Sequence, residues 1–380
     1  MAVLAVAAVS ARLLAEAAAR DGHEVVALDL FGDADTRRAS RLWRPIGMAG
    51  SLRIDAARVL EALRDAARPT GDAAIGWIPG SGFEGQPDLL AAGAGLLPLI
   101  GTPPDAVRSV RDPGQFFEVL AAHGIEHPPV RAEAPPDPAG WLAKDAGGHG
   151  GWHIRDAAAA REALSESGSS RYFQRTMPGV PMSATFIANG SEAMVGGVNE
   201  LIVRPFGVRP YVYAGCIGPV DVTADLARRI AETVRTLTAA FGLRGWCSLD
   251  FLRDGDTMLV LEVNPRPPAS LALYPQRGLI DAQIAACLHG KLPPLSASAA
   301  STRIRGSEIV YAQRSLTLSP VAAQHLAGRA DVHDRPVAGA CFDAGDPVCS
   351  LSAEGDGPEQ VKASLHAARD ALRHTLETLS

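Results

Sequence analysis

The sequence contains little lysine and little cysteine. Only three of its 36 basic residues are lysines, Lys144, Lys291 and Lys362, so a lysine beside a glycine-rich segment stands out. The five cysteines are scattered and are nowhere spaced as CxxC. This pattern argues against a zinc site and against a disulfide framework, and it indicates a reducing compartment.

An excess of positive charge and long apolar runs are also missing. The net charge is -6, which gives no electrostatic footprint for nucleic acid or for an anionic membrane. No apolar run approaches the ~18 residues of a membrane helix. The apolar N-terminus, MAVLAVAAVSA, lacks the basic region of a signal peptide. We therefore expect a cytoplasmic protein that has neither nucleic acid nor membrane as a partner.

The N-terminal part predicts a wound α/β domain. The chain has 380 residues, 47% of them apolar, which is enough for two or three domains with sizeable cores. Strands are expected at residues 2–9 and 23–30, around a helix that Ser10 caps and Gly22 ends. The first turn reads AVSARL and not GxGxxG, which disfavours an enzyme that uses NAD or FAD.

A glycine-rich loop follows the next expected strand of this domain. The strand covers residues 73–78, and the loop reads PGSGFEGQP with Phe83 and Glu84 at its tip. A surface turn is the favoured interpretation of this loop, and contact with substrate is the alternative.

A polar pair interrupts the apolar strand LVLEVNPRP at residues 259–267. Glu262 and Asn264 share one face of this strand because side chains alternate. The preceding strand and turn, SLDFLRDGDTM, predict a β-hairpin, and a loop centred on Asp256 places Asp250 opposite Glu262. Two carboxylates and an amide oxygen on one face suit Mg²⁺. The alternative is an edge strand that ends in a proline-closed turn.

A second glycine-rich loop, KDAGGHGGWHIR, covers Lys144 to Arg155. Its glycines allow the backbone N–H groups to bend around phosphate oxygens, and Lys144 adds a point charge. The glycines are Gly147, Gly148, Gly150 and Gly151. The loop does not match the P-loop pattern. His149 and His153 are interpreted as solvated or structural, with a metal-ligand role as the weaker alternative.

The combination resembles the ATP-grasp ligases. In that family a lysine before a glycine-rich loop, a hinge of the form QxxxxG, a strand aspartate and an ExNxR element occur in this order. Here they are Lys144 with GGHGG, QRTMPG from Gln174, Asp250, and EVNPR from Glu262. The resemblance extends over about residues 107–266, and a wound domain is the expected N-terminal neighbour.

The resemblance implies a role for each matching residue. ATP phosphates would be bound by Lys144, the loop glycines and Arg111, which stands where many members have an earlier lysine; Arg108 is the other candidate for that place. Gln174, Thr176 and Met177 would line the adenine. Asp250, Glu262 and Asn264 would hold Mg²⁺, and Arg266 would face the transferred phosphate, so the catalytic assignment is Arg266 and Lys144.

The sequence also departs from the family pattern. The segment PGVPMSATF lacks the acidic residue that often binds ribose after the hinge, and Ser248 stands where an arginine is common.

Two further segments of the sequence give indications about the substrate. NELIVRPFGVRPYVYAG, from Asn199 to Gly215, concentrates arginines that suit a carboxylate and tyrosines that suit an aromatic acceptor, namely Arg204, Arg209, Tyr211 and Tyr213. A β-hairpin with cross-strand aromatic pairs is the equally favoured alternative. The C-terminal segment DRPVAGACFDAGDPVCSLSA is similar to the tail of a predicted carboligase subgroup related to biotin carboxylase, associated with one-carbon cofactor metabolism in methylotrophs. This likeness implies amide-bond formation, for example the addition of glutamate to a tyramine-like amine.

Together these features predict an α/β protein, α+β in its ATP-binding part, with a wound parallel-sheet N-terminal domain followed by an ATP-grasp domain. The expected ranges are 1–103, 104–305 with a hinge at 174–179, and a β/α extension at 306–380. The expected activity is an ATP- and Mg²⁺-dependent ligation of a small carboxylate to an amine, by a protein that could form a homo-oligomer. A bicarbonate-using carboligase and a non-catalytic nucleotide-binding protein are the alternatives.

Overall fold

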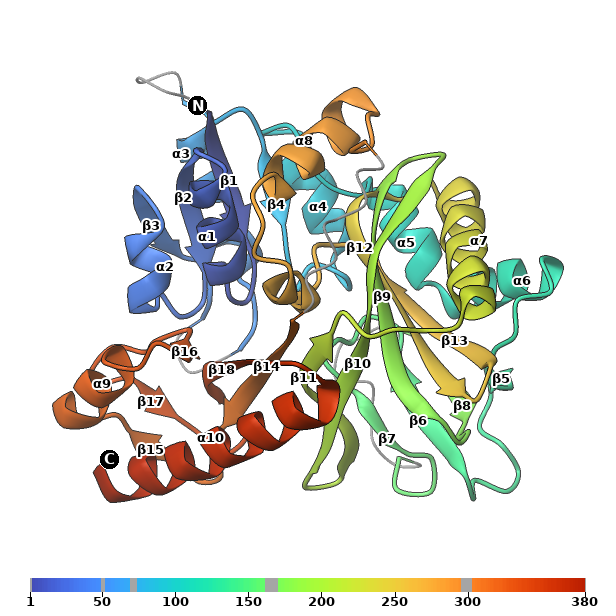
Figure 1. Cartoon of the computed structure of the whole chain (residues 1–380). Helices are drawn as coiled ribbons and strands as arrows, with labels where there is room; N and C mark the ends of the chain where they lie inside the picture. The colour runs from blue at the N-terminus through green and yellow to red at the C-terminus, as the bar shows by residue number, and fades with distance from the viewer. Residues whose placement is uncertain (1, 49–51, 69–73, 161–169, 295–302, 380) are drawn as a thin grey trace.

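The computed structural model describes residues 2–48, 52–68, 74–160, 170–294 and 303–379. In these ranges, no helix combines the length and the apolar character needed to cross a membrane. Figure 1 shows the N-terminal domain beside the C-terminal extension on one side and the ATP-binding part on the other.

The N-terminal domain contains a four-stranded parallel sheet, as the wound topology predicts. Its order is β3 (Leu42–Pro45), β2 (Glu24–Asp29), β1 (Val3–Ala7) and β4 (Trp77–Pro79). The flanking helices are α1 (Arg12–Arg20), α2 (Ala34–Arg38), α3 (Ala56–Ala66) and α4 (Pro87–Ala94). All five residues of β1 are buried, which explains why this strand is continuously apolar.

Two local predictions in this domain were wrong. Ser10 does not cap α1, because its hydroxyl donates to Asp334 and the N-cap position belongs to Ala11, whose N–H donates to Asp29 Oδ2 at 3.1 Å. The strand expected at 73–78 begins later, at Trp77, and residue 73 lies outside the described part of the chain.

An eight-stranded sheet forms the centre of the protein. Its order is β13 (Thr257–Asn264), β12 (Arg244–Asp254), β9 (Val180–Asn189), β10 (Ala193–Phe206), β11 (Arg209–Gly218), β14 (Ile304–Tyr311), β18 (Pro347–Gly355) and β16 (Val332–His333). Because β11 pairs with β14, the sheet continues across the boundary expected at residue 305. The C-terminal extension is therefore joined to the ATP-binding part through backbone hydrogen bonds.

Helix α7 (Ala224–Phe241) covers one part of this sheet and forms a core with β9, β10, β12 and β13. Its apolar residues recur at helical spacing, with Leu226, Ile230 and Val234 all fully buried. Thr223 caps the helix by accepting the N–H of Leu226, and Gly242 ends it in the left-handed conformation. Helix α10 (Pro358–Leu379) packs against β14 and β18 in the same way.

A smaller sheet carries the second glycine-rich loop and the hinge. Its order is β5 (Val130–Arg131), β8 (Arg171–Arg175), β6 (Trp141–Asp145) and β7 (Ile154–Asp156). Lys144 on β6 pairs with Tyr172 on β8, so the lysine and the start of the hinge are neighbours. The remaining elements are α5 (Pro104–Arg111), α6 (Pro113–Ala122), a 3₁₀ turn (Ala269–Leu273), α8 (Leu279–His289), β15 (Leu316–Thr317), α9 (Pro320–Ala327) and β17 (Cys341–Phe342).

Candidate functional site

The β12–β13 hairpin places Asp250 directly opposite Glu262 and Ser248 opposite Asn264, so the predicted pairing is confirmed. The expected loop is not its cause. The turn contains only Gly255 and Asp256 between paired strand ends, which alone would set Asp250 against Leu261. A β-bulge between Asp250 and Phe251 shifts the register by one residue and brings the two carboxylates to the same face.

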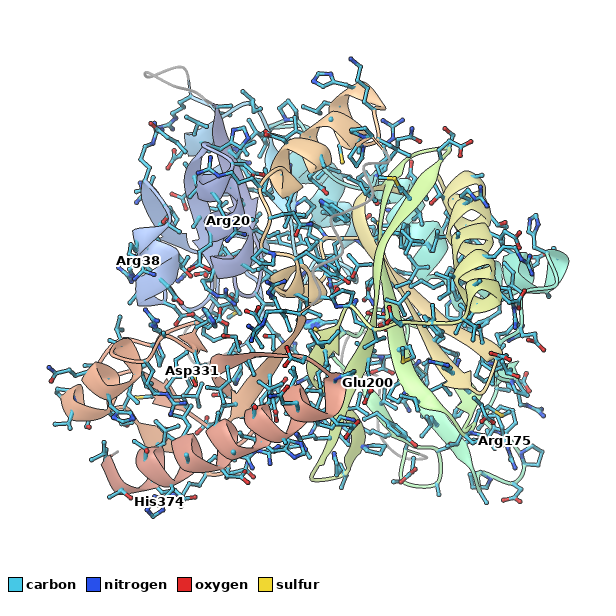
Figure 2. All side chains as sticks on the ribbon, in the orientation of Figure 1. Arg20, Arg38, Arg175, Glu200, Asp331 and His374 are labelled. Atoms are coloured by element: carbon cyan, nitrogen blue, oxygen red, sulfur yellow. The ribbon has the colours of Figure 1, made fainter. Side chains whose placement is uncertain are left out.

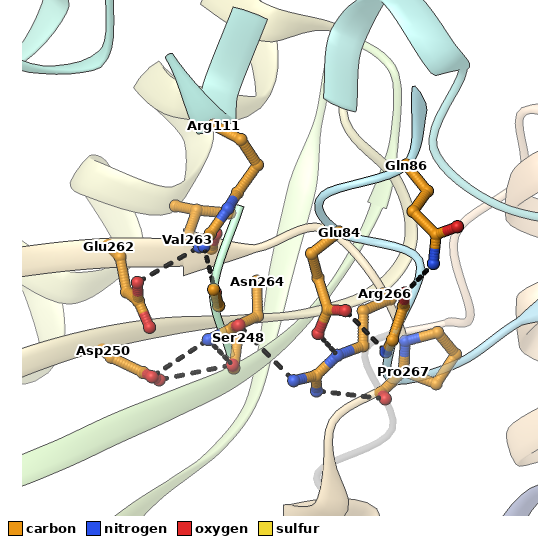
Figure 3. A network of polar contacts seen from close by, with 12 residues as sticks. Glu84, Gln86, Arg111, Ser248, Asp250, Glu262, Val263, Asn264, Arg266 and Pro267 are labelled. Atoms are coloured by element: carbon orange, nitrogen blue, oxygen red, sulfur yellow. Dashed lines mark hydrogen bonds and ion pairs between the residues drawn. The ribbon is translucent and has the colours of Figure 1, made fainter. Parts of the chain in front are cut away.

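The facing carboxylates differ in their electrostatics. Burial and the neighbouring Glu262 raise the pKa of Asp250 to about 7. Burial acts in the same direction on Glu262, but Arg111, Lys144 and His153 outweigh it and lower the pKa of this carboxyl. Asn264 donates to Asp250 Oδ2 at 3.0 Å, as Figure 3 shows. The pair therefore takes up one proton near neutral pH unless a cation lies beside it.

Arg111, at the end of α5, connects the hairpin with the second glycine-rich loop. Its Nη1 donates to Glu262 at 3.1 Å, and its Nη2 donates to the carbonyls of Ala146 and Gly148 at 2.8 and 2.7 Å. Arg108, the other candidate for the missing lysine, pairs instead with Asp88 and Asp105 at the surface. Only Arg111 of these two thus lies at the candidate site.

Lys144 is buried, with 4% of its surface exposed, and donates to Gln174 Oε1 at 3.2 Å. Burial would lower the pKa of this lysine, but Tyr172 and Glu262 outweigh it and raise the pKa. The side-chain nitrogen of Gln174 is buried and has no hydrogen-bond partner among the described residues. Such a donor is costly to leave unpaired, so Gln174 is a fitting group to bind a polar ligand.

Thr176 and Met177 lie on the segment that leaves β8. The backbone N–H of Thr176 donates to the carbonyl of Gly140 at 2.9 Å, and both side chains retain access to solvent. Gln174 therefore lies beside Lys144, whereas the side chains of Thr176 and Met177 lie at the solvent-accessible edge of the candidate site.

The second glycine-rich loop packs tightly against the β10–β11 hairpin. The carbonyl of Gly150 accepts from the N–H of Tyr213 at 2.9 Å, and Arg209 donates to the carbonyl of Trp152 at 2.8 Å. Gly151 has a positive φ of 75°, and a Cβ there would collide with the carbonyl oxygen of Tyr211. Gly147 lies against the first glycine-rich loop, because a Cβ on Gly85 would fall 2.5 Å from its carbonyl oxygen.

His153 lies inside the site, and a Cβ on Gly148 would collide with its ring. Burial lowers its pKa to about 3, so the imidazole is neutral at physiological pH. This agrees with a structural role. Among the residues that the structure describes, no group of three His, Cys, Asp or Glu side chains could hold a metal ion.

Among the predicted substrate residues of the β10–β11 hairpin, Arg204 and Arg209 have hydrogen-bond partners within the protein. Arg204 donates to Glu308 at 3.0 Å, and this fully buried carboxylate also accepts from Arg369 at 2.9 Å. The phenol of Tyr213 is buried beside Cys216, which with burial raises its pKa, and Tyr211 is 37% exposed. Instead of cross-strand aromatic pairs, the hairpin has Phe206 opposite Arg209.

The sequence interpretation missed Glu84, because the loop PGSGFEGQP is not a surface turn. Glu84 and Phe83 are buried, and Arg266 of the EVNPR element donates to Glu84 Oε1 at 2.6 Å. The other oxygen of Glu84 accepts the N–H of Gly82 at 2.7 Å. The one available indication was an acidic residue beside a phenylalanine at the tip of this loop. Glu84 and its partner Arg266 are 182 residues apart in the sequence, so no local pattern could predict their contact.

The residues of the hairpin fit a magnesium ion that takes part of its coordination from a nucleotide. Two half-buried carboxylates that face each other repel unless a cation or a proton lies between them, and Mg²⁺ in proteins is commonly bound by one or two carboxylates plus phosphate oxygens. The oxygen of Asn264 accepts from Arg266 Nη2 at 3.4 Å, so it lies on the same side as this arginine. Asp250, Glu262 and Asn264 would therefore supply only part of the oxygen ligands that Mg²⁺ requires.

Comparison with known proteins locates these residues within one family. Residues 110–270 match the ATP-grasp domain. The carbamoyl phosphate synthase large chain of Thermus thermophilus is 27% identical over 187 residues, which is 44% of this chain and 18% of that protein. The corresponding chain of Beutenbergia cavernae is 30% identical over 204 residues, 46% of this chain and again 18% of that protein. This chain thus spans less than a fifth of these relatives.

Solved structures are similar over almost the whole chain. Biotin carboxylase from Campylobacter jejuni has a TM-score of 0.73 at 15% identity, covering 96% of this chain and 90% of that one. L-amino acid ligase from Bacillus licheniformis has a TM-score of 0.68 at 15% identity and 97% coverage of both chains. N5-carboxyaminoimidazole synthase from Aspergillus clavatus has a TM-score of 0.68 at 15% identity, covering 98% and 99%. The matched domain contains Lys144, Gln174, Asp250 and Glu262 in the predicted order, and residues 110–270 are thus identified as an ATP-grasp domain.

Proposed function

We propose that this protein is an ATP- and Mg²⁺-dependent ligase that joins a small carboxylate to an amine through an acyl phosphate. One observation carries the proposal: the cations Arg111 and Lys144 and the facing carboxylates Asp250 and Glu262 meet at one place, where Lys144 is buried and the other three are half-buried. Such a set of fixed charges suits phosphoryl transfer, where positioning and electrostatic stabilisation supply most of the catalysis.

In this proposal each element binds one part of the nucleotide. Lys144 and the N–H groups of the glycine-rich loop bind phosphate oxygens, and Gln174 offers its unpaired donor to the adenine. Thr176 and Met177 line the adenine from the hinge. Asp250, Glu262 and Asn264 hold the metal, which when bound supplies positive charge to the phosphate oxygens.

The reaction proceeds in two displacements. A carboxylate oxygen of the substrate attacks the γ-phosphorus of ATP, the bond to the ADP oxygen breaks, and an acyl phosphate forms. The amine nitrogen then attacks the acyl carbon, phosphate leaves with the electron pair, and the nitrogen loses a proton to solvent. Arg266 stabilises the charge on the transferred phosphate, and the two glycine-rich loops exclude water that would hydrolyse the intermediate.

The finer substrate proposal is the addition of glutamate to a tyramine-like amine or another cofactor precursor. It rests on the likeness of the C-terminal segment to a carboligase subgroup. The fold likeness to an L-amino acid ligase is compatible with an amino acid as one substrate.

A second candidate activity uses bicarbonate as the carboxylate. The sequence likeness to carbamoyl phosphate synthase favours it, as does the fold likeness to biotin carboxylase domains, one of which was solved with MgADP and bicarbonate. In that case a bicarbonate oxygen attacks the γ-phosphorus and ADP leaves, which gives carboxyphosphate.

The deciding experiment is a screen of acids and amines for release of ADP and phosphate, with the product identified by mass. Ligase activity requires ADP release that depends on both an acid and an amine, and a product that is lighter than their sum by one water. ADP release with bicarbonate but with no amine favours the carboligase. ADP binding that survives Glu262→Gln, with no ADP release for any acid, indicates a non-catalytic nucleotide-binding protein and rejects the proposal.

A further inference from the structure

We infer that the protein has a second anion-binding site, separate from the ATP site, between its N-terminal domain and its C-terminal extension. A pocket of about 410 Å³ lies there. The residues that line it come from α1, from α2 and the residue after it, and from β16 and the segment that follows, namely Glu16, Ala19, Arg20, Asp35, Arg38, Ala39, His333 and Arg335. Its volume is within the range of about 300–1,000 Å³ that small-molecule sites occupy.

Three arginines converge on this pocket. Figure 2 labels Arg20 on α1 and Arg38 on α2, with Asp331 of the C-terminal extension below them. Arg335 reaches the pocket from the extension and is held by the carbonyls of Val332 and Arg329, each at 2.8 Å.

The charges of these arginines are not neutralised by the protein. Within the described ranges, neither Arg20 nor Arg38 has a carboxylate within 4.0 Å, and Arg20 Nε is buried without a hydrogen-bond partner. Two acids also line the pocket, against three arginines, and both have hydrogen-bond partners within the protein. Glu16 binds Arg12 at 3.1 Å, and Asp35 accepts the backbone N–H of Arg335 at 3.0 Å.

His333 contributes no charge that would change this balance. Its ring hydrogen-bonds to Ser352 at 2.9 Å, and burial lowers its pKa. The pocket therefore has an excess of positive charge at physiological pH.

A helix-end explanation accounts for part of this arrangement. Arg20 and Arg38 each stand in the last turn of a helix, where a cation interacts favourably with the helix dipole. That explains each arginine by itself. It does not explain why two helices and a loop of another part of the chain direct three guanidinium groups to one pocket, where they repel one another unless an anion lies between them.

The ligand class follows from the guanidinium group. Its planar fork binds carboxylate and phosphate oxygens through paired hydrogen bonds. We therefore assign the pocket to a small anion that carries phosphate groups or several carboxylates. Because both the N-terminal domain and the extension contribute arginines, the bound anion also strengthens the contact between them.

The test uses the full chain and two probes, pyrophosphate and citrate, in titration calorimetry at low salt. Saturating ADP with Mg²⁺ is present throughout, so that the nucleotide site is occupied. We expect one probe to bind per chain and the affinity to fall with ionic strength. The double variant Arg20→Ala/Arg38→Ala should lose at least about tenfold in affinity, because two charge-assisted contacts are removed.

Arg64→Ala is the matched control, since Arg64 is also an exposed arginine in the last turn of a helix but does not line the pocket. It should bind like the native chain. If the double variant does not fold, the single variant Arg38→Glu, at an exposed position, replaces it with the same expected loss.

Three results would overturn the inference. They are no probe binding by the native chain, native affinity in the arginine variants, or an equal loss in Arg64→Ala. Sedimentation velocity adds a fourth: if the arginine substitutions change the oligomeric state and neither probe binds, the pocket is part of a protein interface and not an anion site.

Discussion

Arg266 Nε lies 2.6 Å from Glu84 Oε1, which joins the end of β13 to a loop of the N-terminal domain. The side chains are 15% and 1% exposed. Burial would raise the pKa of Glu84, but Arg266 and His149 outweigh it and hold the value at about 2. The arginine proposed to face the transferred phosphate is therefore positioned by a carboxylate from another domain.

Glu84→Gln and Arg266→Gln should each lower the free energy of unfolding by about 3–5 kcal/mol, because each leaves one buried charge without its partner. The double variant should lose less than the sum of the two, since the interaction is removed only once. Urea unfolding of all four proteins measures this coupling. Glu61→Gln, at an exposed position of α3, is the control and should be neutral. Additive losses would contradict the proposed pairing.

The pair also predicts a pH dependence. The pKa of Glu84 is lower in the folded chain than its usual value of 4.5, so its stabilisation is complete above that pH and is lost as the pH falls towards 2. The difference in stability between the native chain and Glu84→Gln should shrink over this interval. A constant difference down to pH 3 would show that the charge of Glu84 is not the cause.

Lys144→Ala should weaken ATP binding by at least about tenfold, because it removes the buried cation at the start of the glycine-rich loop. Calorimetric titration with ATP and Mg²⁺ measures the change. The chain offers a close control in Lys291→Ala, an exposed lysine just beyond α8. An unchanged nucleotide affinity in Lys144→Ala would remove the phosphate-binding assignment.

Binding of Mg²⁺ in the presence of ADP should strengthen as the pH rises from 6 to 8. The pKa of Asp250 is raised to about 7 by burial and Glu262, and the ion competes with the proton on this carboxyl. Asp250→Asn should weaken Mg²⁺ binding and remove this pH dependence. Fluorescence of bound ADP analogues at varied Mg²⁺ measures the affinity, with the exposed Asp254→Asn as control. A flat profile in the native chain would argue against Asp250 as a ligand.

In the metal-free chain, Asp250 should instead make the folded state less stable as the pH rises. The unfolded chain loses the Asp250 proton near its usual pKa of 3.8, whereas the folded chain keeps it until about pH 7. The contribution of this residue to stability is therefore present below pH 3.8 and is lost as the pH rises to 7. Urea unfolding of the native chain and Asp250→Asn over this range measures the contribution as the difference between them.

Gly151→Ala should separate the second glycine-rich loop from the β10–β11 hairpin, because the added Cβ collides with the carbonyl of Tyr211. Gly207→Ala is matched in backbone conformation, since Gly207 also has a positive φ but no atom near the added Cβ. Both substitutions carry the backbone strain of about 1–2 kcal/mol, and only Gly151→Ala should weaken ATP binding and expose the loop to trypsin at Arg155. Equal behaviour of the two variants would show that strain alone explains the result.

Short-range patterns were sufficient for several features. The alternation along β13 and the wound start of the chain are local properties of the sequence, and the structure has them where they were expected. The ATP-grasp match of residues 110–270 covers the lysine, the hinge and the hairpin on which the family resemblance was based.

The register of the β12–β13 hairpin could not be predicted correctly from short-range patterns alone. The pairing of Asp250 with Glu262 was predicted from an assumed loop, but a bulge at Asp250 and Phe251 produces it. A bulge depends on how β12 pairs with β9 and on how the hairpin fits the core beneath, and no local pattern in the hairpin specifies it.

The sequence by itself determined which residues are candidates for binding the nucleotide, because their types, spacing and order resemble the motifs of the ATP-grasp ligases. Only the tertiary structure decided which of them meet. It brought Arg111 to Glu262, engaged Arg204 with the buried Glu308 of the C-terminal extension, and set Glu84 beside Arg266. These contacts join residues more than a hundred positions apart, so they depend on the packing of whole domains and on burial, which short segments of sequence do not encode.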